Sequence, residues 1–144
     1  EFNEYVQPGV IPPYGQEWPE EDCVLTGWGL TDGNDDDVPD QLQEVNIMPI
    51  DTSTCAQRMP GPEGPLVKDS HLCIDDHDQS GQKGACSGDS GGPIHCVHEG
   101  VWYVAGAVSW GINTPGTPCD PSFPTVNTRI SHYYDWIMES IGSH

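Results

Sequence analysis

The chain has 144 residues, which is the size of one domain with a substantial hydrophobic core. It carries 23 acidic residues against 4 basic ones, and this formal net charge of -19 excludes the basic surfaces that bind nucleic acid or anionic membranes. No apolar run is long enough to span a bilayer. The 17 glycines and 14 prolines predict many turns, as in an all-β fold of short strands.

In chain order, the first expected element is an extended strap. Residues 1–22 contain four prolines and little periodicity, which indicates a segment that is neither helix nor strand. Beyond the strap, short apolar or alternating runs between turn residues predict strands. We expect these strands over residues 23–29, 44–50, 93–97, 101–110 and 125–130.

The segments between these strands are predicted to be loops, turns and one helix. Residues 31–41 form an acidic loop and residues 60–70 a loop rich in glycine and proline. Glu99 and Gly100 are expected to make a tight turn between two buried strands. The helix covers residues 51–59, and its cap is either Asp51 or Thr52.

A second helix is expected at the C-terminus. It runs from Ser131, its expected cap, to about Ile141. Its apolar residues recur at the spacing of one helix face. They are Tyr134, Ile137, Met138 and Ile141.

This order of elements predicts an all-β fold. About six short strands followed by a terminal helix fit an antiparallel six-stranded β-barrel best. We therefore expect three parts: a strap over residues 1–22, a β-barrel over 23–130 and a C-terminal helix over 131–144. The sequence shows no internal repeat and no second domain.

The six cysteines are widely separated and lack the Cys-x-x-Cys pairs that hold zinc. An even number of cysteines in an acidic, proline-rich chain favours three disulfides and an extracellular location. Their spacing is compatible with many pairings and does not choose among them. The cysteines are Cys23, Cys55, Cys73, Cys86, Cys96 and Cys119.

The segment KGACSGDSGGP, residues 83–93, is built around a candidate nucleophile, Ser90. Acyl transfer needs backbone N–H groups that point at the developing oxyanion, and a tight turn can place two of them together. Gly88 and Gly91 remove side chains where backbone and substrate must come close. Asp89 adds a carboxylate that needs a cationic partner if it is buried. A simple glycine-rich surface turn has the same composition, and serine is a weak nucleophile without a base.

The part of this segment that reads GDSGGP resembles the nucleophile motif of the chymotrypsin-like serine peptidases. Further segments resemble that family in the family's own order, over nearly the whole chain. They are FNEYVQPGVIP (2–12), LTGWG (25–29), Leu72-Cys73, VSWG (108–111), PTVNTR (124–129) and YDWI (134–137). The resemblance implies the second of the family's two β-barrels. The acidic character also resembles the annelid fibrinolytic peptidases of the lumbrokinase type.

The family resemblance further implies how the cysteines pair. It implies the disulfides Cys23–Cys96, Cys55–Cys73 and Cys86–Cys119. All six cysteines would then be used within the chain. No cysteine would remain to link another polypeptide covalently.

The resemblance also implies that the catalytic base lies on another polypeptide. In the family, the first barrel carries a histidine in an Ala-His-Cys context and an aspartate, and both precede the strap. None of the histidines of this chain has that context: His71, His77, His95, His98, His132 and His144. We therefore expect a processed chain of a secreted serine endopeptidase. It associates noncovalently with an N-terminal chain that carries the histidine and the aspartate, and it binds protein substrates and inhibitors.

By the same resemblance, each residue of the Ser90 turn has a role. Ser90 attacks the scissile carbonyl, and the N–H groups of Gly88 and Ser90 hold the oxyanion. Asp89 pairs with the new N-terminal ammonium of the partner chain after activation cleavage. Ser109 bonds the catalytic aspartate, and the edge from Ser109 to Gly111 binds the substrate backbone.

The implied specificity pocket carries no charge at its floor, because Gly84 stands where trypsins have an aspartate. Thr125 resembles the partial block of elastases, so small-to-medium apolar side chains are favoured. Asp120, beyond the long loop over residues 112–119, leaves trypsin-like cleavage after arginine or lysine open. The pocket residues are Gly84, Ala85, Ser109, Trp110, Gly111 and Thr125.

Other chemistries have weaker support. Residues 76–87 resemble a calcium loop, but Ser87 stands where the bidentate carboxylate is needed. We expect no metal and no cofactor. Two non-catalytic alternatives stay open: a pseudopeptidase that only binds proteins, and an inert structural fragment.

Overall fold

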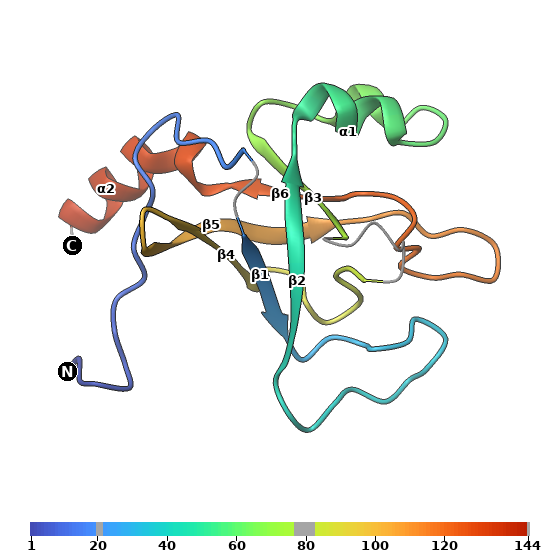
Figure 1. Cartoon of the computed structure of the whole chain (residues 1–144), viewed down its shortest axis with the longest axis horizontal. Helices are drawn as coiled ribbons and strands as arrows, with labels where there is room; N and C mark the ends of the chain where they lie inside the picture. Colours follow the sequence, from blue (N-terminus) through green and yellow to red (C-terminus); the bar gives the residue numbers. More distant parts are fainter. Residues whose placement is uncertain (20–21, 77–82, 144) are drawn as a thin grey trace.

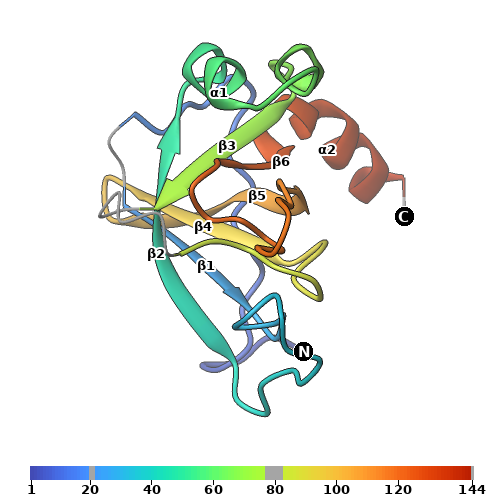
Figure 2. The ribbon, with the colours of Figure 1, turned by 90° about the vertical axis from the view of Figure 1, so that its right-hand side faces the viewer.

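The computed structural model describes residues 1–19, 22–76 and 83–143. Six antiparallel strands close into one barrel in the order β1-β2-β3-β6-β5-β4, and β4 pairs back with β1 (Figures 1 and 2). The predicted all-β barrel with a terminal helix is therefore confirmed. The strands are β1 (Cys23–Gly27), β2 (Gln43–Ile50), β3 (His71–Asp76), β4 (Pro93–His98), β5 (Val101–Trp110) and β6 (Thr125–Arg129).

Strand β3 was not among the predicted strands. Its residues from Leu72 to Asp76 are all buried, so the alternation that marks a half-exposed strand is absent. Two of the buried residues, Asp75 and Asp76, are acidic, so the segment also lacks the apolar run that is typical of a buried strand. Asp75 is tolerated there because Arg58 donates a hydrogen bond to its carboxylate.

The barrel encloses an apolar core. Ile47, Leu72, Ile74 and Ile94 are essentially inaccessible to solvent and belong to one cluster. Trp18 of the strap joins this cluster, and its ring lies 5.5 Å from that of Tyr103, centroid to centroid. The strap is thus anchored on the barrel core by Trp18, the one buried aromatic side chain among its described residues.

Helix α1 (Thr52–Arg58) begins where the sequence predicts. Of the two candidate caps, the structure selects Asp51, whose Oδ1 accepts a hydrogen bond from the Thr54 N–H at 2.8 Å. Hydrogen bonds from the hydroxyls of Ser53 and Thr54 hold the pKa of Asp51 below its ordinary value. The disulfide Cys55–Cys73 then ties α1 to β3.

The expected cap of the C-terminal helix was wrong. A 3-10 turn, Ile130–Tyr133, follows β6, and α2 spans Tyr134–Gly142. Ser131 is buried, and its hydroxyl donates to the strap carbonyl of Gln16 at 3.0 Å. The Ser131 hydroxyl therefore makes a tertiary hydrogen bond to the strap and does not cap the helix. Within the described residues, no helix has the length and apolar character needed to cross a membrane.

Local turns and disulfides complete the barrel. Glu99 and Gly100, at the predicted tight turn, have φ of 50° and 77°, as a hairpin turn with two left-handed residues requires. The disulfides are Cys23–Cys96, Cys55–Cys73 and Cys86–Cys119, the pairing implied by the resemblance, and no cysteine is free. All six cysteines lie in the described part of the chain.

Mild acid is expected to destabilise this fold through His95. Burial in β4 lowers the pKa of its imidazole below 6.5, so the folded chain favours the neutral ring. The stability that this provides is complete above about pH 6.5 and is lost as the pH falls toward the folded-state pKa. The urea midpoint should therefore fall less between about pH 7.5 and about pH 5.5 in His95→Gln than in the unmodified chain. The control is His132→Gln, at an exposed position. If the urea midpoint falls equally with pH in His95→Gln and in the unmodified chain, His95 is not the cause of the pH dependence.

Candidate active site

Ser90 lies on an exposed turn between β3 and β4. Two hydrogen bonds close the turn: Asp89 N–H donates to Cys86 O at 3.0 Å, and Gly92 N–H donates to Asp89 O at 2.8 Å. The N–H of Gly91 donates to Val108 O on β5 at 2.8 Å. The barrel wall therefore holds the candidate nucleophile in place.

Two neighbouring N–H groups of the turn are free to bind an anion. Within the described residues, neither the N–H of Gly88 nor that of Ser90 donates to another group. Gly88 has φ of 101°, a conformation that glycine adopts without strain. The turn thus leaves two donors unpaired in the described structure, one on Ser90 itself and one two residues before it, and donors of this kind can stabilise an oxyanion.

The carboxylate of Asp89 points inward and is only 8% exposed. Its two oxygens accept hydrogen bonds from Gly29 N–H at 2.9 Å and from Cys86 N–H at 3.0 Å. Within the described chain, Asp89 makes no ion pair. A cavity of about 180 Å³ lies beside it, lined in part by Gly27, Gly29 and Lys83.

Glycines in the segment GWG make the room for this carboxylate. A Cβ at Gly29 would lie 2.4 Å from Asp89 Cγ, and one at Gly27 would lie 2.0 Å from Asp89 Oδ1. No real side chain tolerates such distances, so a residue larger than glycine must displace the carboxylate. The sequence analysis gave these two glycines no functional role. Their partner, Asp89, lies far along the chain, 60 residues after Gly29.

Gly29→Ala is expected to disturb the Ser90 turn. The added methyl group must push Asp89 away from the Gly29 and Cys86 N–H groups, each of which then loses a buried acceptor. We expect a loss of unfolding free energy of about 1–3 kcal/mol, measured by urea denaturation. Gly142→Ala is the matched control, because nothing lies within 4 Å of the added methyl group there; a Gly29 variant as stable as that control would show that Asp89 can be displaced without cost.

A cavity of about 120 Å³ adjoins Ser90. Five of the six predicted pocket residues line it, and all of its lining residues are uncharged. Gly84 does not line it; it lines the cavity beside Asp89 instead. The lining residues are Ala85, Cys86, Ser87, Ser90, Val108, Ser109, Trp110, Gly111, Asn113, Cys119 and Thr125.

Ser109 lies at an irregularity in β5. The register between β5 and β6 shifts between Val108 and Trp110, so Ser109 is exposed and has no partner residue on β6. A bulge of this kind turns a side chain and the local backbone out of the ladder. The strand edge from Ser109 to Gly111 is thereby directed along the Ser90 cavity.

Asp120 does not reach this cavity. Its Oδ1 accepts hydrogen bonds from Ser122 and its Oδ2 accepts one from the Thr114 hydroxyl at 2.6 Å. These bonds, first those from Ser122, lower the pKa of Asp120. The carboxylate therefore shapes the loop behind the cavity and leaves the cavity wall uncharged.

Two structural contributors to the cavity were absent from the sequence analysis. Asn113 lines it, and Asn113 Oδ1 accepts from Cys119 N–H at 2.6 Å. Arg58, besides contacting Asp75, donates to Ser122 O at 3.2 Å and so braces the loop before Thr125. Neither residue lies in a motif, and no periodicity marks either one.

No histidine lines the Ser90 cavity in the described part of the chain. His71, His95, His98 and His132 are described, and none is among the lining residues. His77 and His144 lie outside the described residues, as do residues 77–82, half of the calcium-loop-like segment 76–87. Within the described residues, the geometry thus presents a candidate nucleophile and candidate oxyanion donors, and it brings no histidine to the Ser90 cavity.

Comparison with known proteins agrees with this geometry. The family model described as "Trypsin" matches residues 1–137. Fibrinolytic enzyme, isozyme C, from Lumbricus rubellus is 39% identical over 136 residues, which cover 94% of this chain and 54% of that protein. Tryptase from Mus musculus is 35% identical over 145 residues, covering 94% and 50%. Chymotrypsin-like elastase family member 1 from Felis catus is 36% identical over 145 residues, covering 99% and 51%.

The chain spans about half the length of these curated relatives. The family match nevertheless covers the strap, the whole barrel and the start of α2, and it includes the Ser90 turn. The chain therefore belongs to the trypsin family of serine peptidases.

Proposed function

We propose that the chain is the nucleophile-bearing half of a serine endopeptidase. The observation that carries the proposal is the Ser90 turn, which sets an exposed hydroxyl beside the unpaired N–H groups of Gly88 and Ser90. In the proposed reaction, Ser90 Oγ bonds to the scissile carbonyl carbon and its proton passes to a base. The base then protonates the leaving amine, and water releases the acyl group from Ser90.

The base and the aspartate behind it would come from a first barrel on a separate N-terminal chain. Among the residues that the structure describes, no histidine lines the Ser90 cavity, which supports this. Because all six cysteines pair within the chain, we propose that the association is noncovalent. The disulfides also support secretion, since such bonds persist in oxidising compartments.

Exposed apolar side chains support a missing partner. The strap passes the 3-10 turn that precedes α2, where the rings of Tyr14 and His132 lie 6.3 Å apart (Figure 1). The apolar stripe predicted for α2 is only partly covered: Tyr134 and Ile137 are half-buried, Met138 and Ile141 are exposed, and no residue of α2 is fully buried. Exposed apolar side chains in this number are typical of an interface. The exposed residues of the two segments are Phe2, Tyr5, Val6, Val10, Tyr14, Tyr133, Trp136, Met138 and Ile141.

The buried Asp89 carboxylate supports activation by a new chain terminus. It makes no ion pair in the described residues and borders a cavity of about 180 Å³. We propose that an N-terminal ammonium from the partner chain occupies this cavity and pairs with Asp89. The pair would hold the Gly88 N–H group in the orientation that an oxyanion requires.

Native material gives the direct test of the two-chain proposal. Intact-mass spectrometry under denaturing, non-reducing conditions should separate a second polypeptide, and a fluorophosphonate probe should add to the peptide that contains Ser90. If the first barrel proves to be part of the same polypeptide, the two-chain arrangement is wrong and the peptidase stands. If Ser90 stays unlabelled beside an intact partner, the binding role of a pseudopeptidase replaces the enzyme.

The uncharged cavity supports cleavage after small-to-medium apolar residues. Peptide amides that differ only in the residue before the scissile bond should rank alanine, valine and leucine above arginine, by about tenfold or more in kcat/KM. The physical reason is that an arginine side chain would bury its guanidinium in a cavity that offers no carboxylate to pair with it. A preference for arginine or lysine in the same series would instead establish trypsin-like cleavage.

A further inference from the structure

Lys83 lies close to two buried carboxylates. Its Nζ is 4.0 Å from Oδ1 of Asp76, the last residue of β3, and Lys83 also lines the cavity of about 180 Å³ beside Asp89. The Asp76 side chain is inaccessible to solvent and Asp89 is 8% exposed, whereas the Lys83 side chain is 43% exposed. A buried carboxylate without a cation is costly, so this one lysine is placed beside two groups that both favour a counter-charge.

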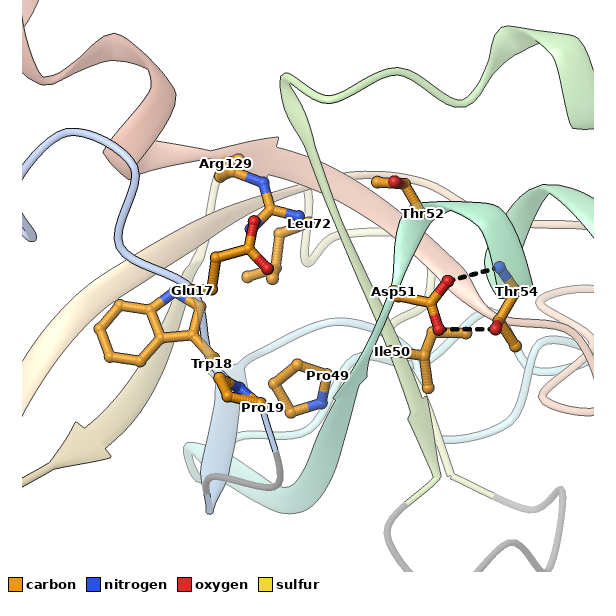
Figure 3. Close-up of a pocket in the computed structure, with 10 residues that line it drawn as sticks. All are labelled: Glu17, Trp18, Pro19, Pro49, Ile50, Asp51, Thr52, Thr54, Leu72 and Arg129. Carbon is orange, nitrogen blue, oxygen red and sulfur yellow. Dashed lines mark hydrogen bonds between the residues drawn. The ribbon is translucent and has the colours of Figure 1, made fainter.

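The other basic residues of the chain are engaged away from the Asp89 cavity. All of them lie in the described part of the chain. Arg129 lines a separate cavity of about 360 Å³, where the strap meets β6 and the junction of β2 and α1 (Figure 3), and this cavity shares no lining residue with the one beside Asp89. The engaged residues are Arg58, which pairs with Asp75, Lys68, which donates to the carbonyl of Pro65, and Arg129, which donates to the carbonyls of Asp69 and His71.

Asp76 is the fixed member of its contact with Lys83. It pairs with Ile47 of β2 in the barrel ladder, and its N–H donates to Asp75 Oδ1 at 3.0 Å. Lys83 belongs to no strand or helix, and a lysine ammonium sits on a flexible four-carbon stem. The ammonium can therefore move from one carboxylate to the other, while the Asp76 carboxylate stays in place.

The position of this ammonium sets the charge of the Asp89 cavity. The charged residues that line the cavity are Glu44, Lys83 and Asp89. With the Lys83 ammonium on Asp76, the two carboxylates of the lining keep the cavity negative, which favours the entry of another cation. With the same ammonium on Asp89, that charge would be neutralised. The contact with Asp76 therefore decides how strongly the cavity attracts a second ammonium.

We infer that Asp76 is a positioning residue for activation of the enzyme. Its carboxylate holds the Lys83 ammonium away from Asp89, so that Asp89 remains for the N-terminal ammonium of the partner chain. Without the charge of Asp76, Lys83 turns into the cavity, pairs with Asp89 and competes with that terminus. The inference rests on the proposed function, which places a terminal ammonium at Asp89. The position of Lys83 can be measured without any activity.

The first test measures the position of Lys83 in the full chain with its accompanying polypeptide, if one exists. Brief treatment with acetic anhydride acetylates accessible amines, and mass spectrometry gives the rate at each lysine. Asp76→Asn should lower the rate at Lys83 about fivefold to tenfold, because the amine is then buried and paired with Asp89. Asp76→Asn combined with Asp89→Asn should restore the rate. Lys68, which is exposed, is the reference in every sample.

Asp75→Asn is the matched control for this acetylation. It removes the charge of a neighbouring carboxylate of β3 that is 7% exposed and contacts a cation, Arg58. Arg58 does not line the Asp89 cavity. The rate at Lys83 should therefore stay as in the unmodified chain, even if the barrel loses stability.

The second test measures fluorophosphonate labelling of Ser90 in the assembled enzyme. Asp76→Asn should slow the labelling about tenfold, because Lys83 occupies Asp89 in most molecules. Asp76→Asn combined with Lys83→Gln removes the competitor and should bring the rate back to within about threefold of the unmodified enzyme. If Asp76 served only the stability of the barrel, the double variant would be as slow as Asp76→Asn, because glutamine does not replace the lost ion pair.

Two outcomes would overturn the inference: an unchanged acetylation rate of Lys83 in Asp76→Asn, or a double variant as slow as Asp76→Asn. If Ser90 stays unlabelled in the unmodified enzyme too, the proposed function fails, and acetylation still shows whether Asp76 holds Lys83. Circular dichroism checks the fold of each variant. If Asp76→Asn does not fold, Lys83→Gln decides, since its position is 43% exposed. It should label within about twofold of the unmodified enzyme, and a tenfold loss would show that Lys83 serves Asp89 directly.

Discussion

Ser90→Ala should abolish peptide hydrolysis, with a loss of about 10⁶-fold in kcat in the enzyme assembled with its histidine-bearing barrel. The substitution removes the oxygen that would bond to the scissile carbonyl, and the surrounding turn can remain as it is. Its backbone contacts run through Asp89, Gly91 and Gly92, none of which uses the Ser90 hydroxyl. Activity on a peptide amide, measured at saturating substrate, gives the result directly.

The control for this variant is Ser143→Ala, a loss of one hydroxyl at an exposed position of the chain end. It should keep full activity. Substrate should also still bind to Ser90→Ala, with a KM or inhibition constant within a few-fold of the parent enzyme, roughly as expected when only a nucleophile is removed. Residual hydrolysis within a factor of about 100 of the parent would show that Ser90 is not the nucleophile.

Asp89→Asn should lower kcat/KM by about 10²- to 10³-fold, comparable with the loss of one oxyanion donor. The two carboxylate oxygens each accept a backbone N–H, from Gly29 and from Cys86. In asparagine, one of these positions becomes an NH₂ group that faces a donor, so one buried N–H loses its acceptor. The turn then loosens next to Gly88, and an ammonium in the adjacent cavity would lose its counter-charge.

Two measurements separate this effect from general unfolding. Urea denaturation should show a loss of about 1–3 kcal/mol, which leaves the barrel folded at room temperature. The rate of fluorophosphonate labelling at Ser90 should fall together with kcat/KM. Asp37→Asn, on the exposed acidic loop, is the charge-matched control and should change neither quantity. An Asp89→Asn enzyme with parental kinetics would refute the proposed role of Asp89.

Local patterns predicted most of the elements of the barrel. Alternation and turn residues located five strands, and they located the hairpin turn at Glu99 and Gly100. They did not locate β3, because a strand that is buried throughout has no alternation to detect. They also misplaced the cap of the last helix, since Ser131 can satisfy its hydroxyl with the distant carbonyl of Gln16.

At the candidate site, the motif around Ser90 predicted which residues share the turn, but not which residues surround it. Its glycines, carboxylate and serine lie within one turn, so their relative positions follow from the turn itself. What surrounds that turn did not follow from any motif. Asn113 reaches the cavity from the loop after β5, and Arg58 braces the facing loop from α1. Gly84 lines the neighbouring cavity, but it also lies next to the pocket, because a Cβ there would be 3.6 Å from Oγ1 of the pocket residue Thr125.

By itself, the sequence determined the family, the fold class, the candidate nucleophile and the donors beside it. The family, the candidate nucleophile and the donors follow from the resemblance of motifs that keep the family's order along the chain, and the fold class also follows from local alternation and turn residues. The tertiary structure alone decided which distant groups meet: Gly29 with Asp89, the strap with the 3-10 turn before α2, and Trp18 with Tyr103 of β5. The physical reason is that these contacts depend on barrel closure, since pairing and burial are collective properties of all six strands. A sequence shows which face of a strand is apolar, but not which distant polar group will be buried beside it without an acceptor, as the indole N–H of Trp18 is among the described residues.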